Sequence, residues 1–310
     1  MLKKLSSTIF LTVGLVSTLA ACGNESSSSA SADTANKGWP EELKLVQMPN
    51  ENNPNAASMH ESLREHLSEE LGIEVKEFEG GSYAVGIEAL ASEKLDVMLA
   101  SPMSYYQADQ LAGAELLVTP QFEGNEYYTA FITKKDNKKI NKMEDLKGMN
   151  FAFVNAASSS GYLYPKGTLV QEFDLDPNLV EKSGYFFENV TFSESHVNSV
   201  MGIKMGDFDA AAVAIGQLDS MIQAGTIKED DFKVIGRTQD IPDASYIVRE
   251  NLPEDFKQAL REAFVSFEDE AYFEAVHNDP KARFVATKQD YYDPTIEMLD
   301  AINALEEEAK

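Results

Sequence analysis

Two stretches of this chain share an order of residue types that constrains its fold. They read GSYAVGIEALASEKLDVML, from residue 81, and ESHVNSVMGIKMGDFDAAA, from residue 194. In each, a serine precedes a ring with a hydrogen-bonding edge, Tyr83 or His196, and an aspartate follows thirteen residues later, at Asp96 or Asp209. The repeat predicts two related lobes that each present a helix start to a shared cleft. The alternative is that any helix, turn and strand unit shows this spacing.

Short apolar runs alternate with helical patterns along most of the chain. Strands are expected at residues 43–49, 73–78, 96–100, 115–119, 127–135, 150–155, 185–192, 210–214 and 232–238. Strands separated by helices are typical of parallel βαβ units, so the fold class is α/β. Residues 251–310 are expected to be helical. We therefore expect a two-lobe binding protein with a hinge and a central cleft: 42–130 plus 242–310 as lobe 1 and 131–241 as lobe 2.

The N-terminus has the pattern of an export signal. Basic residues open the chain, and the apolar stretch that follows, residues 9–19, is too short to span a membrane. It ends in Leu-Ala-Ala-Cys, which resembles a bacterial lipobox, and this Cys22 is the only cysteine. We expect residues 1–21 to be a lipoprotein signal peptide, Cys22 the lipid anchor, and the Ser- and Ala-rich residues 22–41 a flexible tether.

The charge balance excludes one class of partner. The chain has 52 acidic and 26 basic residues, and a surface this acidic repels nucleic-acid phosphates. A small anion is not excluded, because local dipoles govern a buried site. We see no second apolar stretch long enough to span a bilayer, so the expected location is extracytoplasmic, with the lipid as the attachment to the cell membrane.

A serine run suggests where a ligand could bind. Residues 151–167 read FAFVNAASSSGYLYPKG, so Ser158, Ser159 and Ser160 follow an apolar strand and precede a helical pattern. Ligands of open α/β sheets bind at such strand ends, where the first helix amides lack partners and the macrodipole adds about half a positive charge. Serines also cap helices. An anion site and simple capping are therefore both open for this run.

Six segments of the chain carry a resemblance to a known family. They read SYAVGIEAL, DVMLASP, EYYTAFITK, NAASSSGYLYP, SHVNSVMGIKMGDFDAAAV and IPDASYIVRENL, in this order, between about residues 43 and 268. Together they resemble the phosphonate-binding proteins of ABC importers, a PhnD-like family with the type II periplasmic-binding-protein fold. The resemblance implies a substrate-binding protein that captures a phosphonate or phosphite and delivers it to the transporter's membrane subunits, and the lipobox-like N-terminus makes it a lipoprotein.

The resemblance also implies roles for individual residues. Ser158, Ser159 and Ser160 match the family's loop that holds the phosphonate oxygens. Tyr83 and Tyr127 match tyrosines whose hydroxyls reach the same group from the other lobe, and His196 matches a histidine that donates to a phosphonate oxygen. Phenol and imidazole donors suit a desolvated oxyanion.

The chain departs from the family where an aminoethylphosphonate ammonium would be held by acidic residues. One such position corresponds to Gly216, and the other falls at Asp243-Ala244. The departure favours a smaller ligand without an amine: phosphite, methylphosphonate or phosphate. Asp219 could still point inward.

Other function classes fit less well. The serines lack a Gly-x-Ser-x-Gly elbow and the chain has four histidines, so we expect no enzyme and no cofactor. Paired tyrosines could suit a metal ion, which stays an alternative ligand beside phosphate, but a metal site would also need convergent carboxylates or several histidines. An adhesion lipoprotein would not need ordered helix starts facing one cleft.

Overall fold

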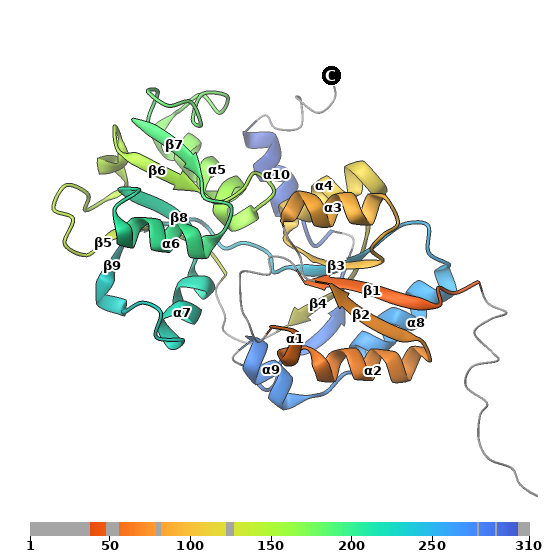
Figure 1. The fold of residues 1–310 in the computed structure, drawn as a ribbon. Coiled ribbons are helices and arrows are strands. Elements are labelled where there is room, and N and C mark those ends of the chain that lie inside the picture. Colours follow the sequence, from red (N-terminus) through yellow and green to blue (C-terminus); the bar gives the residue numbers. More distant parts are fainter. Residues whose placement is uncertain are drawn as a thin grey trace, which may run out of the picture.

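Two sheets organise the part of the chain that the structure describes. The computed structural model describes residues 38–47, 56–78, 82–121, 127–277, 279–288 and 290–302 (Figure 1). The expected signal peptide, Cys22 and most of the expected tether lie outside these ranges. Among the described residues, no helix combines the length and the apolar character needed to cross a membrane.

The first sheet has six strands and forms what we call lobe 1. Its strand order is β11-β4-β10-β3-β1-β2, with β1 parallel to β2 and β3, and with β10 and β11 antiparallel to their neighbours. The strands are β1 (Glu42–Gln47), β2 (Glu74–Phe78), β3 (Val97–Ala100), β4 (Glu115–Gln121), β10 (Ser245–Val248) and β11 (Arg283–Ala286). The helices along this part of the chain are α1 (Ala56–Met59), α2 (Glu61–Leu71), α3 (Tyr83–Ala91), α4 (Pro102–Ala112), α8 (Glu254–Val265) and α9 (Glu270–His277).

The second sheet has five strands and forms lobe 2. Its order is β7-β6-β8-β5-β9, with β6 parallel to β7 and β8, and with β5 antiparallel to β8 and β9. The strands are β5 (Thr129–Lys134), β6 (Asn150–Phe153), β7 (Asn189–Phe192), β8 (Ala210–Ala214) and β9 (Phe232–Arg237). The helices are α5 (Tyr164–Phe173), α6 (His196–Met205) and α7 (Ile215–Gln223), with a π-helical turn at Ser159–Leu163 and short 3₁₀ turns at Met143–Leu146 and Glu229–Asp231.

The two lobes repeat one hydrogen-bonding arrangement around the paired aspartates. In lobe 1, Asp96 Oδ2 accepts from the Lys44 amide at 2.8 Å, and the Asp96 amide donates to the Lys44 carbonyl. In lobe 2, Asp209 makes the same two bonds with the backbone of Asn150, its Oδ2 accepting at 2.9 Å. Each aspartate thus ties the start of one strand to its parallel neighbour, which accounts for the spacing that the sequence repeat shows.

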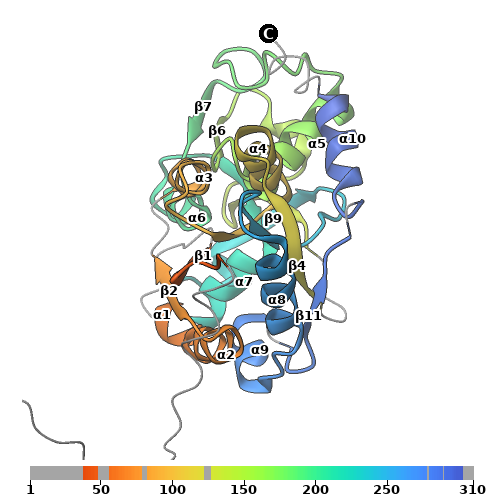
Figure 2. The ribbon, with the colours of Figure 1, turned by 90° about the vertical axis from the view of Figure 1, so that its right-hand side faces the viewer.

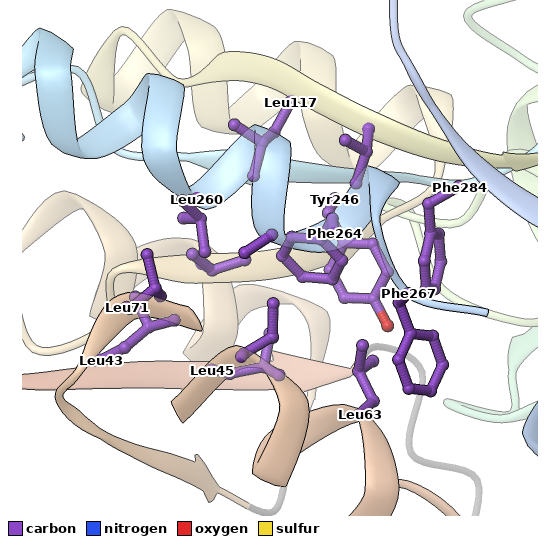
Figure 3. Close-up of a cluster of buried hydrophobic side chains, with 14 of the residues drawn as sticks. Leu43, Leu45, Leu63, Leu71, Leu117, Tyr246, Leu260, Phe264, Phe267 and Phe284 are labelled. Carbon is purple, nitrogen blue, oxygen red and sulfur yellow. The ribbon is translucent and has the colours of Figure 1, made fainter. Parts of the chain in front are cut away.

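Apolar side chains from both faces of the first sheet are buried in lobe 1. Figure 3 shows part of one cluster, in which Leu43 and Leu45 of β1 face α2 and the aromatic ring of Phe264 on α8. Tyr246 of β10 lies beside Phe264, with ring centroids 4.6 Å apart. Lobe 2 has its own core, in which Phe151 and Phe187 stack at 4.4 Å.

Helix α10 (Asp293–Ala301) joins the lobes away from their separate cores. It follows β11 of lobe 1 in the chain but packs against α5 of lobe 2 (Figures 1 and 2). Met298 and Leu299 of α10 share a buried cluster with Met103 of α4 and Tyr164 of α5. The C-terminal region, expected in lobe 1, therefore contacts both lobes.

Strands β10 and β11 were not expected, and the prediction that residues 251–310 are wholly helical is wrong. Strand β10 is a fully buried run of four residues, too short for periodicity to reveal. In β11 only Phe284 is fully buried. Its partner β4 supplies the hydrogen bonds that make it a strand, and a sequence pattern does not show that partner. The second sheet begins at Thr129, two residues before the expected start of lobe 2.

Candidate ligand-binding site

A cavity lies between the lobes, and both contribute to its walls. Its volume is about 370 Å³, within the range of small-molecule sites. The residues that line it come from the starts of α3 and α4, the segments joining the lobes, the serine run, α6, α7 and α9: Tyr83, Ser101, Tyr127, Ser158, Ser160, His196, Ala214, Gly216, Gln217, Asp219, Ser220, Gln223, Ala244, Glu274, Ala275, Val276 and His277. In this set from the described part of the chain there is no lysine and no arginine.

Five of the six expected ligand residues line this cavity: Tyr83, Tyr127, Ser158, Ser160 and His196. They come from both lobes and are separated by up to 113 positions in the sequence. The sixth, Ser159, is not among the lining residues. Its side chain is fully buried, and its Oγ accepts from the Met103 amide of lobe 1 at 2.8 Å. The structure therefore brings together five of the six and uses the hydroxyl of Ser159 between the lobes.

A backbone hydrogen bond orients His196 at the start of α6. The Ala214 amide donates to His196 Nδ1 at 3.1 Å. An amide nitrogen can only donate, so Nδ1 carries no proton, and the neutral ring carries its proton on Nε2. The side chain is 2% exposed, and Nε2 lies 3.3 Å from Ser160 Oγ. His196 therefore directs an N–H donor, not an acceptor, towards Ser160 in the cavity wall.

Ser160 is at the centre of a small set of donors. Its Oγ accepts from Tyr127 Oη at 2.8 Å and from His196 Nε2, and its carbonyl accepts from Thr129 Oγ1 at 2.6 Å. With both lone pairs of Oγ used, the hydroxyl proton is the group left to bond a ligand. Tyr127 and His196 thus orient Ser160 as a donor towards the cavity.

The backbone after β6 explains why the serine run has this shape. Ser158 Oγ accepts from the Gly161 amide at 3.0 Å and so caps the π-helical turn. Pro165 has no N–H to offer the carbonyl of Gly161, four residues earlier, and that carbonyl accepts instead from the Val154 amide at 2.9 Å. Gly161 is needed for packing, because a Cβ there would lie 2.3 Å from Val154 Cβ. Capping and cavity lining therefore occur together in this run.

Helix starts converge on the cavity from both lobes. Ser82, Ser101 and Ser195 cap α3, α4 and α6, each accepting from the amide three residues later. The positive ends of these dipoles favour a negative charge between the lobes. Together with the donors above, this arrangement can hold an oxyanion without a formal positive charge.

The cavity wall formed by α7 and α9 contains acidic side chains and a histidine. Asp219 and Glu274 line it, and burial, then the nearby Glu229, raise the pKa of Asp219. His277 also lines it, and burial, then the nearby His60, lower its pKa to about 4. Within the ranges described, no three or more His, Cys, Asp or Glu side chains are grouped so that they could hold a metal ion.

Of the positions that correspond to the family's amine site, two line the cavity and one does not. Gly216 and Ala244 line the cavity, whereas Asp243 does not. Burial raises the pKa of Asp243 to about 6, and its amide donates to Tyr291 Oη. Asp219, one turn beyond Gly216, does face inward. The cavity therefore has one carboxylate near these positions, but not at either of them.

Ser101, the polar α7 residues Gln217, Ser220 and Gln223, and the α9 wall were not predicted from the sequence. Ser101 carried a usable signal, because a serine between a strand and a proline is typical of a helix N-cap. Nothing in the sequence of α9 indicated that Glu274 and His277 would face lobe 2, since that depends on how the lobes are placed.

Comparison with known proteins identifies the class to which this fold and site belong. The model of the family described as ABC transporter, phosphonate, periplasmic substrate-binding protein matches residues 45–292. The chain belongs to this family, whose members are extracytoplasmic binding proteins of transporters rather than enzymes.

Individual relatives are distant but cover most of the chain. The phosphate-import protein PhnD of Mycolicibacterium smegmatis is 25% identical over 258 residues, 78% of each protein. A binding protein component of an ABC phosphonate transporter from Pseudomonas aeruginosa has a TM-score of 0.73 at 23% identity, covering 83% of this chain and 85% of that one. PhnD1 of Prochlorococcus marinus, in complex with methylphosphonate, has a TM-score of 0.72 at 19% identity, covering 85% and 98%. These structures confirm the expected two-lobe α/β fold.

The close approach at Gly161 predicts a loss of stability. In Gly161→Ala the new methyl group would overlap Val154 and Ser158 Oγ, so the turn must shift. We expect the free energy of unfolding to fall by about 1–3 kcal/mol, the usual cost of overpacking. Chemical denaturation measures this change.

A matched control is Gly216→Ala in the first turn of α7, where a Cβ meets nothing within 4 Å. Helix propensity predicts unchanged or slightly higher stability for this variant. Equal stabilities of the two variants would contradict the packing role assigned to Gly161.

Proposed function

We propose that this protein is the substrate-binding lipoprotein of an ABC importer for a small phosphorus oxyanion: phosphite, methylphosphonate or a related phosphonate. The observation that carries the proposal is the set of neutral donors from both lobes that line one cavity, in which Tyr127 and His196 Nε2–H donate to Ser160 and leave its hydroxyl proton for a ligand. Tyr127 and His196 would bond the ligand themselves by exchanging these bonds to Ser160. Tyr83, Tyr127 and Ser158 complete the proposed ligand residues that line the cavity. Ser159 is fully buried and does not line the cavity, so it would reach the ligand only if its side chain turned towards it.

The chemistry of these groups supports an oxyanion over a cation. Hydroxyl, phenol and imidazole N–H groups donate to anionic oxygens, and such charge-assisted bonds are stronger than neutral ones. Helix N-termini add partial positive charge on the same side. A metal ion, the alternative named above, would need acceptors where these donors lie.

The choice among phosphorus oxyanions rests on the part of the cavity wall that contains Gly216 and Ala244. Gly216 and Ala244 offer no carboxylate for an ammonium group, which favours a ligand without an amine. Asp219, near Gly216, and Glu274 of α9 both line the cavity and could still accept from an amine. Phosphate remains the alternative ligand, as the name of the Mycolicibacterium relative shows for that protein.

Transport follows from closure of the lobes around the ligand. The ligand contacts come from lobe 1, lobe 2 and the segments between them, so a bound anion favours the arrangement in which these parts meet. The membrane subunits of the transporter would then recognise the closed form. The hinge would lie where the chain passes between 42–130 plus 242–310 and 131–241.

Calorimetric titration with phosphite, methylphosphonate, aminoethylphosphonate, phosphate and sulfate tests the proposed function. We expect tight binding of at least one small phosphorus oxyanion. In Ser160→Ala and His196→Ala the affinity should fall about ten- to a hundredfold, the value of a hydrogen bond to a charged group.

Ser220→Ala is the matched control, because Ser220 lines the same cavity but its hydroxyl donates to the Gly216 carbonyl within α7. Its affinity should change less than about twofold. If none of the five anions binds, the serines only cap a helix and the proposed ligand class is wrong.

The proposed membrane attachment is separate from ligand binding. It rests on Cys22 and the lipobox-like residues before it, and it places the mature protein outside the cytoplasm on the cell membrane. A diacylated cysteine with its acyl chains in the bilayer would provide an anchor without a membrane-spanning helix.

Fractionation of bacterial cells that express the full chain tests this attachment. The wild type should sediment with membranes and carry a lipid on Cys22 by mass spectrometry, and Cys22→Ser should appear in the soluble fraction. Equal distribution of the two proteins would contradict a lipid anchor.

A further inference from the structure

Ser101 is a cavity residue to which the proposed function gives no role. It follows β3, caps α4 and is 7% exposed. It lines the cavity on the lobe 1 side, together with the lobe 2 donors Ser160 and His196. Whether it donates or accepts there depends on its own hydrogen bonds.

Those bonds define the direction of the Ser101 hydroxyl. Ser104 Oγ lies 2.8 Å from the Ala157 carbonyl, which can only accept, so the single Ser104 hydroxyl proton is used there. Ser104 is fully buried, and its Oγ is also 3.0 Å from Ser101 Oγ. The proton in this second bond must therefore come from Ser101.

Ser101 consequently faces the cavity as an acceptor. Its proton is directed to Ser104, and one lone pair accepts from the Ser104 amide at 3.4 Å. The second lone pair is left for a ligand. Ser160, in contrast, offers its proton, because Tyr127 and His196 both donate to its Oγ, so these two serines have opposite roles in the cavity.

An acceptor of this kind discriminates between protonation states. A lone pair facing a deprotonated oxygen is repelled and stays unpaired, whereas a P–OH group on the ligand would donate to it. We propose that Ser101 makes the site select an oxyanion that carries one hydroxyl, such as the monoanion of a phosphonate or phosphite, over the fully deprotonated form and over sulfate. This inference rests on the proposed function.

The selection depends on contact between the lobes. Ala157 belongs to lobe 2, whereas Ser101 and Ser104 belong to lobe 1, so the bond that directs the hydroxyl is lost if the lobes separate here. The acceptor is therefore formed by the same arrangement that encloses the ligand.

Calorimetry of the full chain with methylphosphonate, from about pH 7 to about pH 9.5, tests the inference through proton linkage. Above the second pKa of the ligand, the affinity of the wild type should fall about tenfold per pH unit, because binding takes up one proton. Titration in buffers of different ionisation enthalpy counts that proton. Sulfate should bind far more weakly than methylphosphonate.

The pH range and one variant control for three of the protein's own titrating groups, and comparison with Ser101→Gly, which keeps all of these groups, controls for the others. The groups facing the cavity, besides Tyr83, Tyr127 and His196, are Asp219, Glu274 and His277, with Asp243 nearby. The pKa of Asp243 is about 6 and that of His277 about 4, both below the range. Burial raises the pKa of Asp219, and Asp219→Asn removes it from the titration; the slope should persist in that variant.

Two variants test whether the pH dependence and the selection against sulfate are due to the Ser101 hydroxyl. Ser101→Gly removes the acceptor and costs little as a cap, so the pH slope should be lost. Ser104→Ala leaves Ser101 in place but frees its proton, which should shift the ratio of affinities towards sulfate by about tenfold. Ser104→Ala also loses the bond to Ala157, which affects the binding of both ligands. The readout is therefore the ratio of the methylphosphonate and sulfate affinities, not either affinity alone.

The outcomes separate the inference from the proposed function. A wild-type affinity that is level or rises through the ligand pKa overturns the inference but leaves the proposed function standing. A slope that persists in Ser101→Gly overturns the role of Ser101. Failure of methylphosphonate and of every other phosphorus oxyanion to bind would overturn the proposed function itself.

Discussion

The hydrogen bond from the Ala214 amide to His196 Nδ1 is the interaction on which the rest of the site depends. It joins the end of β8 to the start of α6 and leaves the ring with its proton on Nε2. Without that bond, the ring could present a lone pair to the cavity, and Ser160 would lose one of its two donors. The chain has a net charge of −26, and the described residues that line the cavity include no lysine or arginine. Instead of a basic side chain, a backbone hydrogen bond orients the neutral donor His196.

The pseudo-repeat of the two lobes places these donors. In each lobe an aspartate ties two parallel strands at one end, and a serine-capped helix begins with a ring that lines the cavity, Tyr83 in α3 and His196 in α6. The lobes are not identical, since Asp96 also pairs with Arg249 and Asp209 with the Asn150 side chain. The common arrangement explains how residues far apart in sequence meet between the lobes.

Much of the fold could be predicted from sequence, because the strand and helix patterns are local and the family motifs are spread over the chain. Five of the six expected ligand residues line one cavity, because all six were identified from these family motifs. The direction of Ser159, the acceptor character of Ser101 and the α9 wall could not be predicted, since each depends on a contact between the lobes. Strand β11 was missed because its partner β4 lies more than 160 residues earlier.

The most direct test of a binding site made of neutral donors is ¹⁵N NMR of the His196 ring in the methylphosphonate complex at neutral pH. The His196 signal is assigned by its loss in His196→Gln. We expect a neutral ring protonated on Nε2, with the resonance of that nitrogen shifted on ligand binding. A doubly protonated ring, a ring protonated on Nδ1, or a signal that does not respond to methylphosphonate would contradict it.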